Sequence, residues 1–390
     1  MIERNRKSKR QLKRILFITN GFPFWGDQGA GGIGEFTFTL ASELSKAGIK
    51  AYVLGCSKDV QEAEHKEASN LVTHVIPFLQ FRIGSEYLNR IRLNILIFKY
   101  VLLKRIQIVE TASYLGWVWP FRPPIPMVVR LHSASTIDVI NDQHLNTKIP
   151  QRITFELKLI DRASILVSVC DYVKSGFQTS QHITSKNNII TIYNGIDTEK
   201  YRPDPSRRSP YHVLLVGNVV RAKGIEDALL AWGKVIEMIP EARLTVVGSI
   251  QSAYARAIIE RYKTGFGDNI SFVGVVANSD LPKYYGVASV FISASHYEAN
   301  PLVILEAMSS GCAVVCPDHT GFQEIISQGL DGILCDTTDA IVFSQVIIKL
   351  LQDTNLREKL GIAARNTILE KFNFYKQLKQ NIDLYENYLK

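Results

Sequence analysis

The sequence predicts an α/β protein of two domains, each built on a doubly wound parallel sheet. Short apolar runs alternate with amphipathic helical stretches along the chain, a pattern typical of parallel sheets covered by helices. The alternation stops at residues 194–210, which hold three prolines and several charges, and starts again at Tyr211. A chain of 390 residues is long enough for two cores. We therefore predict a first domain at 1–195, with a C-terminal helix at 373–390, and a second domain at 196–372.

The first half has seven apolar segments of strand length and four segments of helical periodicity. A glycine-rich loop follows the first strand, and the helix after it ends at Gly48, a residue suited to a helix C-terminus. We expect strands at 14–20, 51–55, 71–77, 106–110, 127–131, 164–169 and 188–192, and helices at 33–47, 87–103, 151–161 and 171–179.

The second half repeats the same alternation. Ligands of such sheets bind beyond the carboxyl ends of the strands, so we expect a cleft between the two domains. The last segment, 374–389, has apolar residues at helical spacing and is expected to pack back on the first domain. We expect strands at 211–216, 243–247, 270–273, 289–293, 313–316 and 332–335, and helices at 224–238, 251–263, 281–286 and 321–327.

The composition is that of an ordinary globular protein, with 46% hydrophobic and 21% charged residues. Five scattered cysteines favour buried free thiols in a reducing compartment over disulfides or a zinc site. No run of 18 apolar residues occurs, and the charged N-terminus lacks an apolar segment. We therefore expect no membrane span, no signal peptide and a cytoplasmic location.

Positive charge is concentrated in the first half. Residues 1–200 hold 26 basic and 17 acidic residues, whereas residues 201–390 hold 19 and 20. A basic half can bind nucleic acid, an anionic membrane or an anionic substrate. The first 14 residues alone carry seven basic groups and one acid, although such a tail can also serve only solubility.

The helix expected at 87–103 has two faces. Its apolar residues at helical spacing are Leu88, Ile91, Ile95, Phe98 and Leu102. We expect its basic side to dock near anionic lipid or an anionic glycan; the alternative is a core helix with a solvated edge. The basic residues in and around it are Arg82, Arg90, Arg92, Lys99, Lys104 and Arg105.

The stretch 295–311 carries the most informative pattern. Glu298 and Glu306 are separated by seven residues, and Asn300-Pro301 lies between them. Asn300 is a suitable helix N-cap and Pro301 a suitable first helical residue. The free amides of a helix start can seat a phosphate. A ligand with a diphosphate and hydroxyl-rich groups at both ends would fit, although both acids could instead be plain surface residues.

The segment 29–34 matches the G-x-G-x-x-G pattern of dinucleotide-binding loops. The match is poor in context, because the loop starts eight residues after its strand and the second strand ends without an acid for a ribose. A dehydrogenase is therefore disfavoured. The glycines can still let the backbone approach a phosphate or sugar closely, or they can form only a flexible turn.

Two cations, Arg221 and Lys223, follow the first strand of the second half. They could neutralise a diphosphate leaving group, or they could be a solvated surface pair. The chain has no Asp-x-Asp and no P-loop motif, so neither carboxylate-held magnesium nor a P-loop kinase is expected. His132 follows a strand and could face the cleft, although a single histidine is often structural.

Together these features resemble the retaining glycosyltransferases of family 4, which have the GT-B fold. The likeness runs from about Arg14 to the C-terminus and is most specific over 213–332. Asn218 departs from the family, which often has arginine there; Arg221 is the candidate to replace that charge. The residues that carry the likeness are Glu298 and Glu306 with Asn300-Pro301 between them, Lys223-Gly224, Asn194-Gly195-Ile196-Asp197 and Gly31-Gly32.

The resemblance implies a role for each site residue. Glu306 would hold the ribose hydroxyls of a nucleotide-sugar, and Glu298 would bind sugar hydroxyls. Lys223 would pair with the diphosphate, and His132 would line the sugar site. The remaining donor-binding residues would be Gly31 and Gly32 from the first domain and Arg221, Asn300, Pro301 and Leu302 from the second.

The resemblance also implies the activity. The enzyme would transfer a sugar from a nucleotide diphosphate donor to an acceptor hydroxyl with retention, using no metal or cofactor. We expect His132, Lys223 and Glu298 to be catalytic. Polysaccharide or lipid-linked glycan synthesis fits. Separately, the basic N-terminal domain suggests peripheral contact with an anionic membrane, and no nucleic-acid partner is expected. Two alternatives remain: another GT-B enzyme such as a nucleotide-sugar epimerase, or a non-catalytic nucleotide-sugar-binding protein.

Overall fold

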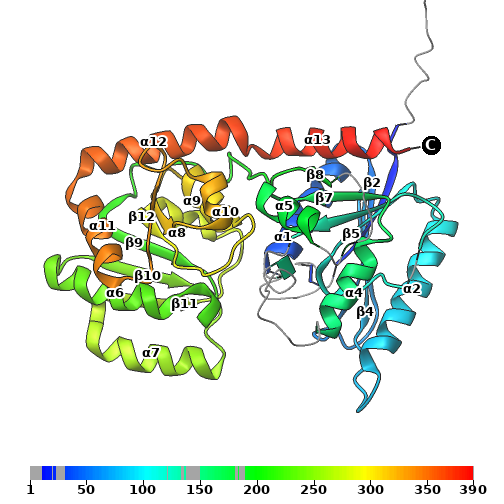
Figure 1. Cartoon of the computed structure of the whole chain (residues 1–390), viewed down its shortest axis with the longest axis horizontal. Coiled ribbons are helices and arrows are strands. Elements are labelled where there is room, and N and C mark those ends of the chain that lie inside the picture. Colours follow the sequence, from blue (N-terminus) through cyan, green and yellow to red (C-terminus); the bar gives the residue numbers. More distant parts are fainter. Residues whose placement is uncertain are drawn as a thin grey trace, which may run out of the picture. The chain divides into compact units, whose positions relative to one another are not determined.

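The protein is described by a computed structural model that covers residues 11–19, 21–22, 31–120, 122–132, 136–137, 150–180, 183 and 189–389. The chain divides into two compact units (Figure 1). The first unit consists of the chain up to Tyr193 and the C-terminal segment from Lys376 onward. The second unit runs from Asn194 to Tyr375. Each unit contains a sheet with helices packed on it, so the predicted α/β class with two doubly wound sheets is confirmed.

The sheet of the first unit has eight strands in the order β3-β4-β2-β1-β5-β6-β7-β8. All neighbours are parallel except β3 and β4, which form an antiparallel pair. Strand β3, which is mostly charged and exposed, was not predicted because it lacks an apolar face. The strands are β1 Arg14–Ile18, β2 Lys50–Ser57, β3 Glu64–Ala68, β4 Leu71–Pro77, β5 Ile108–Ala112, β6 Met127–Leu131, β7 Ile165–Ser168 and β8 Ile189–Thr191.

Helices of the first unit connect these strands. From β1 the chain moves to β2 and β4 on one side and then returns to β5 on the other side, so β1 and β5 flank a reversal of strand order. The helical segments are α1 Gly31–Lys46, α2 Ser85–Leu103, the 3-10 turn η2 Tyr114–Gly116, α4 Gln151–Ile160 and α5 Asp171–Thr179.

The sheet of the second unit has six strands, all parallel, in the order β11-β10-β9-β12-β13-β14. Here β9 and β12 flank the reversal. The strands are β9 Ser209–Val216, β10 Arg243–Val247, β11 Ile270–Gly274, β12 Ala288–Ile292, β13 Ala313–Pro317 and β14 Ile333–Cys335. The helices are η3 Arg221–Lys223, α6 Ile225–Met238, α7 Ala253–Phe266, η4 Gly267–Asn269, α8 Leu281–Val287, α9 Leu302–Ser309, α10 Thr320–Ile325, α11 Ala340–Gln352 and α12 Thr354–Lys371.

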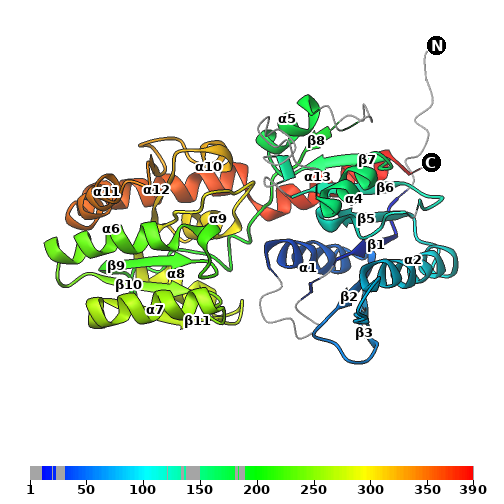
Figure 2. The same cartoon turned by 60° about the horizontal axis from the view of Figure 1, so that its bottom comes forward.

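Alternate residues of the strands build the core of the second unit. Val213 and Leu215 of β9 face the side covered by α6, α7 and α11, where Trp232 is fully buried. Figure 2 shows α6 and α7 running along the β9–β10 part of this sheet. The strands of this sheet are mostly apolar, as is usual when both faces of a parallel sheet are covered.

The last helix, α13 Phe374–Asn387, packs on the first unit as predicted. The Tyr385 hydroxyl donates to Glu110 (2.6 Å), and Arg130 donates to Glu110 (2.7 Å) and to Asn381 (2.5 Å). All four side chains are buried. Burial, followed by the Glu110 charge, holds the pKa of Tyr385 well above its usual range, so the hydroxyl stays protonated and keeps donating.

The predicted basic docking surface of α2 is wrong for Arg90, whereas Lys99 and Lys104 are exposed. Arg90 lies in the buried face, donates to the Gly116 carbonyl and has its guanidinium carbon 4.4 Å from the Phe155 ring centre. Arg92 donates to the Pro77 carbonyl (2.9 Å). These internal partners on η2, α4 and β4 turn the arginines inward and the apolar stripe outward.

Among the described residues, no helix is long and apolar enough to cross a membrane.

Candidate functional site

The predicted site residues Lys223 and Glu298 of the second unit lie where the strand order reverses. In open parallel sheets, ligands bind at the carboxyl ends of the two strands that flank such a reversal. Lys223 follows β9 and Glu298 follows β12, and the Lys223 ammonium forms an ion pair with the Glu298 carboxylate. The fold therefore brings together a cation and an acid that are 75 residues apart in the sequence.

Glycines allow the loops around this pair to pack closely. Gly224 has φ +59°, and a Cβ there would lie 1.9 Å from the Ala294 carbonyl oxygen. A Cβ on Gly321 would lie 2.0 Å from the Ala299 oxygen. The His296 amide also donates to the Ala222 carbonyl (3.0 Å). The loop that carries Glu298 is thus held between two glycine-containing segments, which fixes the backbone of the site.

The start of α9 differs from the prediction. Pro301 is the N-cap residue and Leu302 the first helical residue, and no side chain caps the helix. Asn300 is turned inward instead, with 7% of its surface exposed. Among the described residues neither atom of its side-chain amide has a partner. The Asn300 carbonyl accepts from the Asn194 side chain (3.4 Å), and the Asn194 side-chain oxygen, also buried, has no partner there either.

These two buried amides are informative because buried polar groups normally have hydrogen-bond partners. Their unused donors and acceptors adjoin the first turn of α9, whose leading amides have no partner within the helix. These side-chain atoms are covered by protein, so a polar ligand at the start of α9 would reach them only after the side chains turn toward it. Asn194 was not among the predicted site residues, although the Asn194–Asp197 motif pointed to its neighbourhood.

Glu306 lies within α9 and is 8% exposed. The Tyr285 hydroxyl of α8 donates to Glu306 Oε2 (2.7 Å). Tyr285 is fully buried, and its burial, followed by the Glu306 charge, holds the pKa of Tyr285 well above its usual range. Tyr285 therefore acts as a permanent donor that orients the carboxylate. No feature of the sequence indicated this partner.

Arg221 and Lys223 point to different neighbours. The Arg221 guanidinium carbon lies 5.4 Å from the ring centre of Tyr254 on α7, and the arginine is exposed. Asn218 accepts from the Ser249 amide (3.0 Å) and so links the loop after β9 to the loop after β10. The structure thus gives Asn218 a role in loop packing and places Arg221 over an aromatic ring.

A second group of predicted residues lies in the first unit, at the reversal between β1 and β5. A cavity of about 250 Å³ there is lined by Gly31 and Gly32 together with Tyr114 and Trp117 from the loop after β5. The Trp117 indole nitrogen is buried and has no partner among the described residues. Gly29 and Ala30, the start of the glycine motif, lie outside those residues.

His132 directly follows β6. Its ring packs edge-on against Phe36 of α1, with 5.2 Å between ring centres. Burial, followed by the charge of Arg130, lowers the pKa of His132 to about 3. The imidazole is therefore neutral near pH 7 and can donate or accept a hydrogen bond, but it contributes no positive charge and is a weak base.

Two family models match successive parts of the chain. Glycosyltransferase Family 4 matches residues 30–200, and Glycosyl transferases group 1 matches residues 197–367. The chain belongs to glycosyltransferase family 4. Together the matches extend over both units, and the junction between them lies in the segment that joins the two sheets.

Known proteins similar to this glycosyltransferase fit that assignment. The capsular polysaccharide biosynthesis glycosyltransferase CapM of Staphylococcus aureus is 26% identical over 242 residues, which are 58% of this chain and 63% of CapM. Sucrose-phosphate synthase of Thermosynechococcus elongatus superposes with a TM-score of 0.82 at 22% identity, covering 96% of this chain and 98% of that one. HepE of Anabaena, in complex with UDP-glucose, superposes with a TM-score of 0.73 at 16% identity, covering 96% and 99%. The two superpositions establish the GT-B fold.

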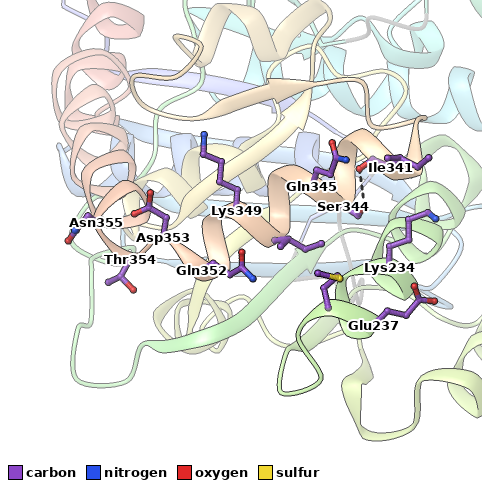
Figure 3. Close-up of a pocket in the computed structure, with 12 residues that line it drawn as sticks. Lys234, Glu237, Ile341, Ser344, Gln345, Lys349, Gln352, Asp353, Thr354 and Asn355 are labelled. Atoms are coloured by element: carbon purple, nitrogen blue, oxygen red, sulfur yellow. Dashed lines mark hydrogen bonds between the residues drawn. The ribbon is translucent and has the colours of Figure 1, made fainter.

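A larger groove of this glycosyltransferase, about 980 Å³, lies elsewhere on the second unit. Figure 3 shows Lys234 and Glu237 of α6 on one side and Gln345 and Lys349 of α11 on the other. Helix α6 begins near the carboxyl end of β9, and Lys234 and Glu237 belong to the opposite, C-terminal end of this helix. The groove contains none of the predicted site residues, so size alone does not identify the site.

Proposed function

We propose that this glycosyltransferase moves a sugar from a nucleotide diphosphate-sugar to an acceptor hydroxyl, with retention of the anomeric configuration and without a metal. The observation that carries the proposal is the convergence of Lys223, Glu298 and the start of α9 at the reversal of the second sheet. The UDP-glucose bound to HepE supports a donor of this class.

In the proposed complex the diphosphate lies at the start of α9 beside Lys223. Positive charge and helix amides stabilise the negative charge that develops on the leaving group. The Asn300 and Asn194 side chains, once turned toward the donor, supply further hydrogen bonds. Glu306, oriented by Tyr285, accepts from the ribose hydroxyls, and Glu298 accepts from hydroxyls of the sugar.

The transfer step breaks the bond between the anomeric carbon and the diphosphate oxygen and forms a bond to the acceptor oxygen on the same face. The acceptor proton passes to the departing diphosphate oxygen, so no side chain is needed as a base. A step without a side-chain base agrees with the low pKa of His132. We assign His132 a role in positioning sugar hydroxyls instead. Arg221 serves as a second, more distant cation for the diphosphate.

We propose a glycan acceptor, either a growing polysaccharide or a lipid-linked sugar, on the cytoplasmic side of the membrane. CapM supports this class of pathway. Gly31 and Gly32 would approach the substrates, and the cavity that they line with Tyr114 and Trp117 offers aromatic surfaces, which suit a sugar ring.

The experiment is a transfer assay with UDP-, GDP- and ADP-sugars and a mixture of glycan and lipid-linked acceptors, in which nucleoside diphosphate release and product anomer are both read. We expect release with one donor, a product of unchanged configuration, and a loss of about 10-fold or more in Lys223→Met. Lys234→Met, at the far end of α6, is the matched control. Interconversion of free donor sugars would indicate an epimerase, and binding without turnover would indicate a non-catalytic protein; either result contradicts the proposal.

A further inference from the structure

Helix α2 of the first unit presents a continuous apolar stripe to solvent. Tyr87, Leu88, Ile91, Ile95, Phe98 and Leu102 are 39% to 55% exposed. Their spacing of three and four residues places them on one side of the helix. A stripe with this spacing usually faces a core, so its exposure requires an explanation.

The orientation of α2 is fixed by contacts on its opposite side. The Asn89 side chain accepts a hydrogen bond from the Leu79 amide (3.0 Å) and donates to the Leu79 and Ser85 carbonyls (both 2.8 Å). Arg90 donates to the Gly116 carbonyl and lies over aromatic rings. A rotation that buried the stripe would break these buried bonds. The apolar stripe is therefore a stable feature of the surface.

The surroundings of the stripe are apolar and basic. Phe81 and Ile83 precede the helix and Leu103 ends it, and Ile83 is 89% exposed. A hollow of about 250 Å³ beside Ile95 is lined by the cations Arg92 and Lys99. In Figures 1 and 2, α2 runs along the outside of its unit. Within residues 81–105 the exposed cations are Arg82, Lys99, Lys104 and Arg105, against the single acid Glu86.

We propose that α2 is a membrane-docking helix that lies in the plane of an anionic lipid surface, with its apolar stripe inserted between the lipids. An exposed apolar face bordered by cations is the pattern of helices that bind at the boundary between headgroups and acyl chains. Lys99 and the residues at the C-terminal end of the helix are placed to meet lipid phosphates. Docking here would bring the enzyme to a lipid-linked acceptor; only that consequence rests on the proposed function.

A second copy of the chain fits this face less well. The 19 residues of α2 extend about 28 Å, and a helix is about 10 Å wide, so the stripe offers roughly 300 Å² in projection. A stable dimer buries about 800 Å² on each partner. A two-fold contact would also set the same cations of both copies against each other.

The test is vesicle flotation with phosphatidylcholine, with and without phosphatidylglycerol, using the full chain. The double variant Ile91→Ser with Ile95→Ser removes the centre of the stripe. Its matched control is Ile341→Ser with Ile362→Ser, two helix isoleucines of the second unit that are 56% and 65% exposed. A third variant, Lys99→Ser with Lys104→Ser, removes two cations.

We expect the wild type to bind anionic vesicles and the stripe variant to bind them about 30-fold more weakly, which corresponds to about 2 kcal/mol for two half-exposed isoleucines. The control variant should bind within about twofold of the wild type. The cation variant should lose binding only to the anionic vesicles, and added salt should have the same effect.

Absence of wild-type binding, or equal losses in the stripe and control variants, would overturn the proposal. So would a dimer in sedimentation that the stripe variant dissociates, since the stripe would then be a contact between copies. Nucleotide-sugar binding, measured by calorimetry, should be unchanged in the stripe variant. Vesicle binding without any donor binding would reject the proposed function and uphold the docking helix.

Discussion

The hydrogen bond from Tyr285 to Glu306 provides the sharpest test of how the second unit is organised. Tyr285→Phe removes only the hydroxyl, which lies 2.7 Å from the carboxylate oxygen. Both groups are buried, and hydrogen bonds to charged groups contribute about 1.5–3 kcal/mol. We expect the free energy of unfolding to fall by about 2 kcal/mol. Because Glu306 then has to be reoriented when the ribose binds, donor affinity should fall about 10-fold, which is about 1.4 kcal/mol.

Tyr201→Phe is the matched control for this experiment. Tyr201 is also buried in the second unit, its ring centre lies 5.7 Å from that of Tyr285, and its hydroxyl donates to Asn278 (3.0 Å). Urea unfolding should show a loss of about 1 kcal/mol for Tyr201→Phe. Calorimetric titration with the preferred nucleotide-sugar should show an unchanged affinity for this variant.

The comparison separates orientation of the carboxylate from general packing. If Tyr285→Phe and Tyr201→Phe bind the donor equally well, Glu306 does not depend on Tyr285 for ligand binding. If both variants lose affinity in proportion to their loss of stability, the effect is one of packing. Either result would refute the assignment of Tyr285 as a positioning residue.

Three further predictions concern backbone, pH and metal. Gly224→Ala should lower the free energy of unfolding by at least about 2 kcal/mol, because Gly224 has a positive φ and its added Cβ would lie 1.9 Å from a carbonyl oxygen. The control Gly265→Ala in α7 has open space around its Cβ and should be neutral or stabilising by up to about 1 kcal/mol. Urea unfolding compares the two variants, and equal values would contradict the loop geometry. The lowered pKa of His132, about 3 against an ordinary 6.5, means that the folded protein binds fewer protons than the unfolded chain between these values, so the free energy of unfolding should fall as pH falls through that window. That fall should be smaller in His132→Asn, and an identical pH dependence would show that the pKa of His132 is not lowered in the folded protein. EDTA should leave transfer unchanged, and a loss restored by magnesium would contradict the metal-free proposal.

The sequence predicted the parts of the fold and site that depend on local pattern. The alternation of strands and helices was sufficient to predict the two parallel sheets. Lys223 and Glu298 each follow a strand, so the strand order alone places both residues at one edge of the sheet. The antiparallel β3 was missed because its residues are polar on both faces. The roles of the site residues remain predictions.

What the sequence could not supply depends on distant partners. Asn300 fits an N-cap by residue type, yet its side chain is drawn inward beside Asn194, 106 residues earlier. Tyr285 gave no signal, because its contact with Glu306 comes from the packing of α8 against α9. Helix periodicity identified the two faces of α2 but not which face is buried, since Arg90 finds its partners in η2 and α4.

The central claim is that the second unit binds a nucleotide diphosphate-sugar through Lys223 and the start of α9. Calorimetric titration of the wild type and Lys223→Met with UDP-, GDP- and ADP-sugars, and with the matching nucleoside, tests it most directly. We predict that one nucleotide-sugar binds the wild type, that Lys223→Met binds it about 10- to 100-fold more weakly, and that nucleoside binding is unchanged, since only the diphosphate contact is lost. Absence of binding by every donor, or equal affinity in wild type and variant, would contradict the claim.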